Sequence, residues 1–375
     1  MNITGIITEY NIFHNGHKYQ IDEIKKHSDA VIAVMSGSFV QRGDVAITDK
    51  WSRAKMALSG GVDLVIERPV CYALNAAPNF ATGGINILNA LGVVNNICFG
   101  SESGSIDELM SAAELLENEN SEISEKIKKY VMGGMSYPNA LTKAYSALIP
   151  SDILSEPNNI LATEYIRALI RSDSKIKPMT VKRHKAGYHD RNLYQNIASA
   201  TKLREMKRNN ENINDFIPYK LEDINCDIPY DISNLDSAII SKLRLMTAED
   251  LQNISEVTEG IENRILSSAN MSYSFETLVE NVKNKRYTTS KIRRMIISAL
   301  IGFTKDIYSP MPQYIRILGM NKVGMTILKQ AKDTCKVPII TKTADFKEQS
   351  PQFNLDVRAT NIAMLCNPIP THRIG

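Results

Sequence analysis

Short apolar runs alternate with helical patterns through the first half of the chain. Strand-like runs span residues 3–7, 30–35, 62–66, 96–99 and 178–183, and the run at 30–35 is continuously apolar. Strands that are apolar on both faces indicate a sheet covered on both sides. Apolar residues at helical spacing predict helices between them, over residues 17–26, 50–58, 81–91, 108–117, 121–132, 137–147, 159–170 and 200–207. This alternation predicts a parallel α/β sheet that binds ligands beyond the carboxyl ends of its strands. The loop after Ile7 is therefore expected at a ligand site.

The pattern changes after residue 208, where the polar run 209–212 is typical of a linker. Helices are expected beyond it at residues 233–245, 258–268, 274–282 and 290–301, with short strand-like pieces at 314–317 and 337–340. A chain of 375 residues is long enough for two domains. We therefore predict an α/β catalytic domain over residues 1–208 and a mostly helical domain over residues 209–375.

Composition excludes several classes of protein. Apolar residues make up 43% and charged residues 23%, so disorder is not expected. No apolar run reaches the roughly 18 residues of a membrane span, and the first residues lack the basic region of a signal peptide. The five cysteines are scattered without a Cys-x-x-Cys pair, so neither a thiolate zinc site nor a disulfide framework is expected. These features favour a cytosolic protein without a metal site of its own, and leave its oligomeric state open.

The net charge of +3 is small, but the charges are unevenly distributed. Residues 171–208 hold eleven Lys/Arg and three Asp/Glu, and residues 283–294 hold six basic residues and no acidic one. Basic surfaces of this kind can bind phosphates. The alternative interpretation is a pair of solvated helix faces.

The strongest local signal is the loop that ends in His14-Asn15-Gly16-His17, between the first strand and the first helix. Histidines three residues apart can face the same side of a helical turn. The free N–H groups of a helix start favour phosphate, and Gly16 allows close approach of a ligand. Two imidazoles there can stabilise the charge that develops during displacement at phosphorus. The alternative is two ordinary surface histidines beside a turn.

A second signature begins at Ile197 and continues through Ser199, Thr201 and Lys202 to Arg204, at an expected helix start. The two hydroxyl groups can cap the helix and contact phosphate, while Lys202 or Arg204 neutralises phosphate charge. A plain N-cap is the alternative. Residues 288–294 also match the pattern, but no strand precedes them, so we assign them to RNA binding.

These two motifs resemble the His-x-Gly-His and Ile-Ser-x-Thr-x-x-Arg signatures of the nucleotidyltransferase superfamily, which shares its architecture with the class I aminoacyl-tRNA synthetases. Further segments are similar to the tRNA(Met) cytidine acetate ligase family of bacteria: residues 35–43, 49–57, 63–69, 99–102, 156–161, 183–190, 285–287 and 291–295. One departure is Ile12, where that family usually has proline, which would preset the backbone of the loop.

The resemblance implies a Rossmann-like catalytic domain of the nucleotidyltransferase type and a reaction in two steps. Acetate attacks the α-phosphate of ATP, giving acetyl-adenylate and pyrophosphate, with Mg²⁺ carried by ATP. The N4 amine of the wobble cytidine (C34) of elongator tRNA(Met) then takes the acetyl group, giving N4-acetylcytidine and AMP. A small-molecule adenylyltransferase acting on a phosphorylated cofactor precursor is the alternative, although such enzymes often lack the 165 or so additional residues found here. A catalytically inactive RNA-binding protein is disfavoured because both motifs are complete.

The resemblance also implies residue roles. The catalytic set is His14, His17 and Arg204. The ATP-binding set is Ile7, Thr8, Glu9, Tyr10, Asn11, Ile12, Phe13, His14, Asn15, Gly16, His17, Lys18, Tyr19, Gln20, Gly100, Asn158, Asn159, Arg183, Ser199 and Thr201. Helix capping is the alternative for the two asparagines. Acetate or phosphate contact, or a structural salt bridge, is open for three further residues: Ser36, Lys50 and Arg53.

The resemblance further implies that the basic segments bind tRNA. The expected backbone contacts are Lys185, Lys285, Arg286, Arg293 and Arg294, together with Arg183; Tyr188 or Tyr287 is available for base stacking. A solvated surface is the alternative for each of these residues. His189 and Asp190 either orient a base or fix their own loop.

Overall fold

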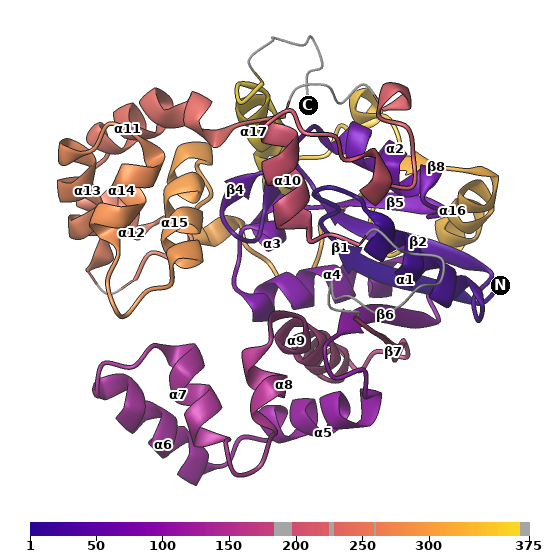
Figure 1. The fold of residues 1–375 in the computed structure, drawn as a ribbon, viewed down its shortest axis with the longest axis horizontal. Coiled ribbons are helices and arrows are strands. Elements are labelled where there is room, and N and C mark those ends of the chain that lie inside the picture. The colour runs from indigo at the N-terminus through magenta and orange to yellow at the C-terminus, as the bar shows by residue number, and fades with distance from the viewer. Residues whose placement is uncertain (184–196, 225–228, 259, 368–375) are drawn as a thin grey trace.

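A seven-stranded sheet forms the centre of the molecule in a computed structural model, which describes residues 1–183, 197–224, 229–258 and 260–367 (Figure 1). In spatial order the strands are β7 (Lys177–Lys182), β6 (Asn96–Ser101), β1 (Ile3–Thr8), β2 (Ala30–Ser36), β5 (Leu64–Arg68), β8 (Ile315–Met320) and β9 (Ile339–Ile340). The first five are parallel, β8 is antiparallel to β5, and β9 is parallel to β8. The predicted α/β class is confirmed, with an antiparallel strand added beside β5.

Helices cover both faces of the sheet, as the continuous apolar strands predict. Along β2, Ile32 and Val34 pack into one core and Val31, Ala33 and Met35 into the other. The first core includes α3 (Val70–Ala73), α4 (Ala77–Leu91), α5 (Ile106–Glu117), α9 (Pro157–Arg171) and α16 (Lys322–Thr334). The second includes α1 (Asn15–Lys25), α2 (Lys50–Ser59) and α10 (Ala200–Arg208).

The strand order reverses between β1 and β6. From β1 the chain adds β2 and β5 on one side, and then crosses back to add β6 and β7 on the other. Ligands bind at such a reversal in open α/β sheets. The loop from β1 into α1 lies at this place, so the sheet positions the predicted ligand loop where its topology requires.

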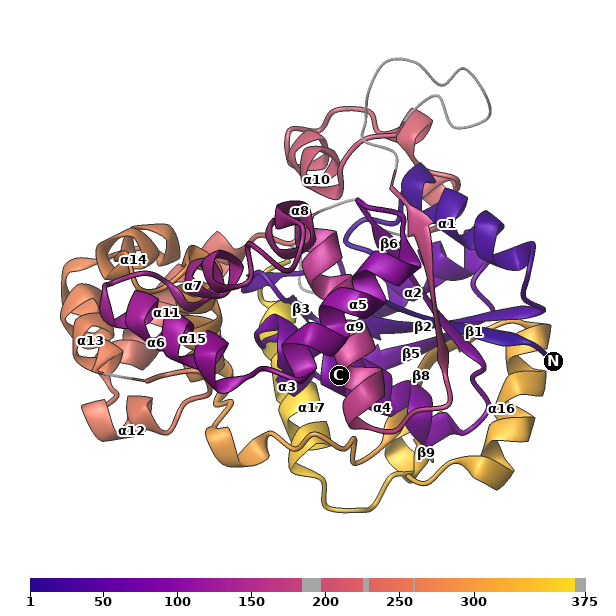
Figure 2. The ribbon, with the colours of Figure 1, turned by 90° about the horizontal axis from the view of Figure 1, so that it is seen from below.

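Two helical groups extend from the sheet (Figures 1 and 2). One consists of α6 (Ser121–Met132), α7 (Tyr137–Ala144) and α8 (Ser151–Ser155), which follow α5. The other is a bundle of α11 (Asp236–Arg244), α12 (Ala248–Gln252), α13 (Ile261–Met271), α14 (Phe275–Val282) and α15 (Thr289–Ile301). A small hairpin of β3 (Phe39–Val40) and β4 (Asp44–Val45) contacts α15. Five 3-10 turns span Asn214–Phe216, Leu221–Asp223, Ile232–Leu235, Lys305–Ile307 and Thr343–Asp345.

The last part of the chain returns to the sheet, which differs from the expectation of a separate helical domain over residues 209–375. The strand-like pieces at 314–317 and 337–340 lie within or beside β8 and β9, which extend the sheet past β5. Helix α17 (Pro351–Met364) then packs on α3, where Asp356 accepts a hydrogen bond of 2.7 Å from the Val70 backbone. The pairing of β8 with β5 covers an edge of β5 that would otherwise expose unpaired backbone groups. This is a physical reason for the chain to return to the sheet. Within the described residues, no helix is both long and apolar enough to cross a membrane.

Candidate active site

His14 and His17 are held by the start of α1. His14 is the N-cap residue; its Nδ1 accepts a hydrogen bond of 3.1 Å from the backbone N–H of Gly16. His17 lies in the first turn, and its Nδ1 accepts a bond of 3.2 Å from the backbone N–H of His14. The rings stack, with centroids 3.7 Å apart and planes inclined by 20°. This reciprocal capping starts the helix at Asn15, two residues earlier than expected.

The capping bonds fix the tautomers of both rings. A nitrogen that accepts from a backbone N–H carries no proton, so each neutral ring has its hydrogen on Nε2. Burial, followed by the charges of Arg183 and Arg204, lowers the pKa of His14 to about 4. Burial, His14 and Arg183 lower the pKa of His17 well below its usual value. At neutral pH the rings are therefore uncharged Nε2–H donors.

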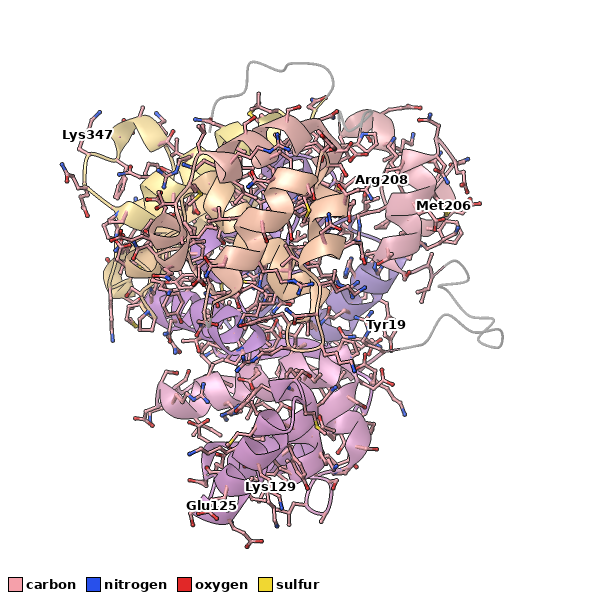
Figure 3. All side chains as sticks on the ribbon, turned by 90° about the vertical axis from the view of Figure 1, so that its left-hand side faces the viewer. Tyr19, Glu125, Lys129, Met206, Arg208 and Lys347 are labelled. Atoms are coloured by element: carbon pink, nitrogen blue, oxygen red, sulfur yellow. The ribbon has the colours of Figure 1, made fainter. Side chains whose placement is uncertain are left out.

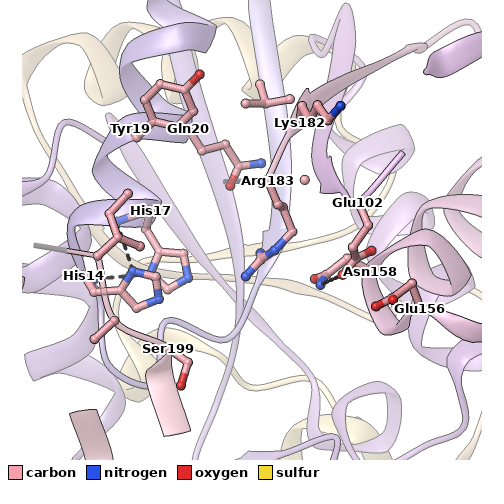
Figure 4. Close-up of a pocket in the computed structure, with 15 residues that line it drawn as sticks. His14, His17, Tyr19, Gln20, Glu102, Glu156, Asn158, Lys182, Arg183 and Ser199 are labelled. Atoms are coloured by element: carbon pink, nitrogen blue, oxygen red, sulfur yellow. Dashed lines mark hydrogen bonds between the residues drawn. The ribbon is translucent and has the colours of Figure 1, made fainter. Parts of the chain in front are cut away.

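A cavity of about 220 Å³ lies beside the two imidazoles, at the carboxyl ends of β1, β6 and β7 (Figure 4). Arg183 follows β7 and extends into the cavity between the histidines and Asn158. An added Cβ on Gly100 would lie 3.1 Å from the Arg183 side chain, so glycine leaves room for that arginine. The cavity lining consists of His14, Gly16, His17, Tyr19, Gln20, Gly100, Glu102, Glu156, Asn158, Val181, Lys182, Arg183, Ile197, Ala198 and Ser199.

The structure gives different positions to the two neighbouring asparagines at the start of α9. Asn159 is completely buried; its Oδ1 accepts from the backbone N–H groups of Glu102 and Ser103 at 2.9 and 3.1 Å, and its Nδ2 donates to the Asp152 carbonyl. Asn158 lines the cavity and donates to the Glu102 carboxylate at 2.5 Å. Asn159 therefore fixes the loop after β6, and Asn158 is the one placed to meet a ligand.

Of the residues of the second motif that were predicted to contact phosphate, one lies in the wall of the cavity. Ser199 lines the cavity and caps α10, accepting from the backbone N–H of Lys202 at 3.2 Å. Arg204 donates to the Asn11 carbonyl and, at 3.1 Å, to the Thr201 hydroxyl. The motif therefore joins α10 to the histidine loop, and neither Arg204 nor Thr201 forms part of the cavity wall.

Several residues of the expected ATP-binding set lie away from the cavity lining. Four apolar or aromatic side chains are buried in the two cores: Ile7, Tyr10, Ile12 and Phe13. Others make contacts that shape the loop; Glu9 accepts from the Gln41 backbone at 2.7 Å and Asn11 accepts from the Ile47 backbone at 2.8 Å. The remaining members outside the lining are Thr8, Asn15, Lys18, Asn159 and Thr201. Ile12, at the position of the family proline, follows a cis peptide bond.

Ser36, Lys50 and Arg53 are enclosed by the fold. Lys50 is fully buried and donates to Glu67 at 2.6 Å and to the Thr360 hydroxyl at 2.9 Å. Arg53 donates to the backbone carbonyls of Thr48, Glu9, Ser36 and Gly37. Lys50 thus makes the structural salt bridge that was the alternative, with Glu67. The contacts of Arg53 are with backbone carbonyls instead, and the Ser36 hydroxyl accepts from Arg68.

Sequence reasoning gave no role to three charged residues of the cavity wall: Glu102, Glu156 and Lys182. Glu102 accepts from Asn158 and from the backbone of Asn159, so it organises the side opposite the histidines. Both glutamates lie inside segments that resemble the family, and this resemblance could have identified them as site residues. Within the described ranges no three His, Cys, Asp or Glu side chains are grouped to hold a metal ion.

The expected RNA contacts fall into two groups. Lys285 and Arg286 are exposed and line a groove beside α6. Arg294 is buried and pairs with Glu256 at 2.6 and 3.0 Å, and Arg293 pairs with Glu276 at 2.6 Å. Both also donate to the β3–β4 segment, so they attach the bundle to the sheet domain. Tyr287 is largely buried, and four expectations fall outside the described residues: Lys185, Tyr188, His189 and Asp190.

Comparison with known proteins shows the family and the fold. The family model described as HIGH Nucleotidyl Transferase matches residues 1–374. The tRNA(Met) cytidine acetate ligases of Clostridium novyi and Acetivibrio thermocellus are 40% and 39% identical, over 98% and 100% of this chain and 96% and 97% of theirs. The crystal structure of Thermotoga maritima TmcAL bound with alpha-thio ATP superposes with a TM-score of 0.89 at 32% identity, covering 100% of this chain and 96% of the other. The apo form I of the same protein gives 0.90, also at 32% identity, covering 100% and 97%.

Proposed function

Because the chain belongs to the tRNA(Met) cytidine acetate ligase family of HIGH-type nucleotidyltransferases, we propose that it activates acetate with ATP and acetylates N4 of the wobble cytidine (C34) of elongator tRNA(Met). The observation that carries the proposal is the pair of neutral Nε2–H imidazoles facing Arg183 across one cavity. This donor set suits a polyphosphate, and the relative that binds alpha-thio ATP superposes over the whole chain. A cytoplasmic location is part of the proposal.

The first step is displacement at the α-phosphorus. A carboxylate oxygen of acetate forms a bond to phosphorus, the bond to the bridging oxygen breaks, and pyrophosphate leaves. His14 and His17 donate to the non-bridging oxygens as their charge develops, and Arg183 supplies positive charge. In this proposal Mg²⁺ arrives with ATP, bound by its phosphates.

The second step is acyl transfer. The exocyclic nitrogen of cytidine attacks the acetyl carbon, the bond from that carbon to the phosphate oxygen breaks, AMP leaves, and the nitrogen loses a proton to solvent. The base must leave its stack to reach the cavity, which an anticodon loop allows.

A groove between α6 and the bundle is the proposed site of the tRNA backbone. It is lined by Met132, Arg264, Lys285 and Arg286, among others. Figure 3 looks onto the bundle, with α6, marked by Glu125 and Lys129, below it. Exposed cations at such a groove bind phosphates without regard to sequence.

The test measures pyrophosphate release from ATP in an acetate-free buffer, with acetate and unmodified tRNA added separately and together. We expect release to require acetate, and labelled acetate to enter RNA only when tRNA(Met) is present. Release without acetate, driven by a phosphorylated cofactor precursor, would support the small-molecule adenylyltransferase instead. A tRNA(Met) transcript with uridine at the wobble position is the matched control and should remain unlabelled.

A further inference from the structure

Arg68, the last residue of β5, is a buried cation without an anionic partner. Its side chain is completely enclosed, and its Nη2 donates to the Ser36 hydroxyl. Its Nε and Nη1, which carry three N–H bonds between them, have no hydrogen-bond partner in the described parts of the chain. Burial lowers the pKa of Arg68 to about 10, so the group stays charged at neutral pH. An uncompensated buried charge is strongly destabilising.

The other buried arginines each have a partner of opposite charge or a set of acceptors. Arg294 pairs with Glu256 through two nitrogens. Arg316 lies 3.3 Å from the Glu67 carboxylate, although the two atoms of this ion pair have no hydrogen-bond partner among the described residues. Arg53 has backbone carbonyls as acceptors. Arg68 differs from all three, because it has neither a carboxylate within ion-pair distance in the part of the chain that the structure describes nor a set of carbonyl acceptors, and most of its donors are unused. A buried cation with unused donors is suited to an anionic ligand.

The surroundings of Arg68 also favour an anion. Its guanidinium lies 3.4 Å from the ring centroid of Phe80, a residue of the first turn of α4. No side chain caps that helix start, which therefore adds a positive dipole end and free N–H groups. The carboxylate of Glu9 raises the pKa of Arg68, but it is hydrogen-bonded to the Gln41 backbone.

Arg68 lies at the end of the sheet where the reaction is proposed to occur, outside the lining of the histidine cavity. The sheet register puts Arg68 beside Ser36 of β2, and the preceding residue of β2 beside Thr8 at the end of β1. Neighbouring strands are about 4.8 Å apart, so Arg68 lies about two strand spacings from the end of β1, after which the histidine loop begins. Its side chain also approaches Tyr165, which packs 5.8 Å from Phe99 of β6. The guanidinium is thus close to the reversal of strand order between β1 and β6.

We propose that Arg68 is the receptor for the carboxylate of the acid that this enzyme activates, with the first turn of α4 completing the site. The proposal rests on the proposed function and adds the residue that recognises the acid. The carboxylate accepts hydrogen bonds from the unused donors of Arg68, while its attacking oxygen faces the α-phosphorus. Bond formation transfers that oxygen's negative charge to the departing pyrophosphate, and no further reactant is needed.

The enclosure of Arg68 explains a preference for short acids. Phe80 lies against the guanidinium, and Ile7 and Tyr165 are buried beside the same end of the sheet. A methyl group is the smallest substituent that an acid of this type carries beyond formate, and a longer chain would have to displace the Phe80 ring. A closed site also protects an acyl-adenylate from water.

The test compares Arg68→Met, Arg68→Lys and the matched control Arg316→Met by ATP–pyrophosphate exchange, with acetate titrated into chloride buffer. We expect Arg68→Met to raise the KM for acetate on the order of 100-fold, because a charge-assisted carboxylate contact is lost. Its KM for ATP should change less than about twofold, since only acid binding is affected. Arg68→Lys should be intermediate, and Arg316→Met should change neither KM by more than about twofold.

The unfolding midpoint of the Arg68 variants distinguishes a role in ligand binding from a structural role. Replacing an unpaired buried cation by methionine should leave the unfolding midpoint unchanged or higher. An unchanged KM for acetate in folded Arg68→Met overturns the proposal, as does an equal loss of ATP and acetate binding. If that variant does not fold, acetate without ATP should raise the midpoint of the wild type more than that of Arg68→Lys, and an equal rise overturns the proposal. Wild-type exchange that needs no acetate refutes the proposed function instead.

Discussion

Replacing His17 by glutamine separates the two jobs of this residue. Its Nδ1 accepts from the N-cap backbone and its Nε2–H faces the cavity. A glutamine three residues after the N-cap can accept the same backbone bond but supplies no imidazole donor. Loss of one preorganised donor slows displacement by about 10²–10³-fold, or about 3–4 kcal/mol. Loss of the capping bond should lower the free energy of unfolding by about 1 kcal/mol in His17→Ala, and by little in His17→Gln.

The assay is acetate-dependent pyrophosphate release at saturating ATP and acetate, beside urea unfolding. Both His17→Gln and His17→Ala should lose the rate, and His17→Ala alone should also lose about 1 kcal/mol of stability from the missing cap. Loss of packing against Tyr10 and Phe13, whose rings lie 4.9 and 5.5 Å away, will add to the cost in both variants, and more in alanine, which leaves the larger cavity. A His17→Gln enzyme with the wild-type rate would refute the assignment of the imidazole to phosphate.

Three further predictions follow from the geometry. Because the pKa of His14 is about 4 when folded and about 6.5 when unfolded, its contribution to stability should be complete above pH 6.5 and fall as pH drops toward 4, measured by urea unfolding. Asn159→Ala should lower stability by about 2–3 kcal/mol because two buried backbone N–H groups lose their acceptor, whereas Asn158→Ala should mainly raise the KM for ATP. The double variant of Lys285 and Arg286 to alanine should reduce the slope of log Kd for tRNA against log salt by about 1.4–1.8, seen in filter binding.

Each has its own control. Replacing His14 by glutamine should remove its part of the pH dependence between pH 4 and 6.5, and an unchanged curve contradicts the shift. If Asn158→Ala and Asn159→Ala raised the KM for ATP equally, the distinction between Asn158 as part of the cavity wall and Asn159 as a support of the loop after β6 would be wrong. The groove variant should keep its acetate-dependent exchange, since those residues lie in the groove beside α6 rather than in the histidine cavity; a loss of exchange would place them at the catalytic cavity instead.

The centre of the sheet could be predicted because strands such as β2 and β5 are buried along their whole length. The edge strand β7 is only partly buried and was identified by its resemblance to a strand after the helices. The rule for ligand position then pointed to the loop after β1. The return of the chain to the sheet was harder to see. Strand β9 has two residues, and β8 carries the charged Arg316 and a glycine, so neither shows a long apolar run. Their place depends on contacts made more than 200 residues apart, which local periodicity does not encode.

The candidate site was predictable where a motif places a side chain relative to a helix start. His14, His17 and Ser199 belong to this group, because capping geometry is local. Whether a charged side chain faces the cavity or the protein interior depends on distant partners. Arg294 pairs with a glutamate 38 residues away, and the distinction between Asn158 and Asn159 depends on the loop after β6. Residue type alone could not separate such cases.

The histidine loop ties protonation to the start of α1. The two rings stack 3.7 Å apart, a distance that two positive charges would oppose. A proton can be added only at Nδ1, which is the atom that accepts the capping bond in each ring. Protonation therefore removes a helix cap and introduces repulsion at the same time, beside the cations of Arg183 and Arg204. Acid should thus disorder the histidine loop rather than titrate a catalytic base, and in the proposed reaction the positive charge for ATP comes from the arginines and the helix start.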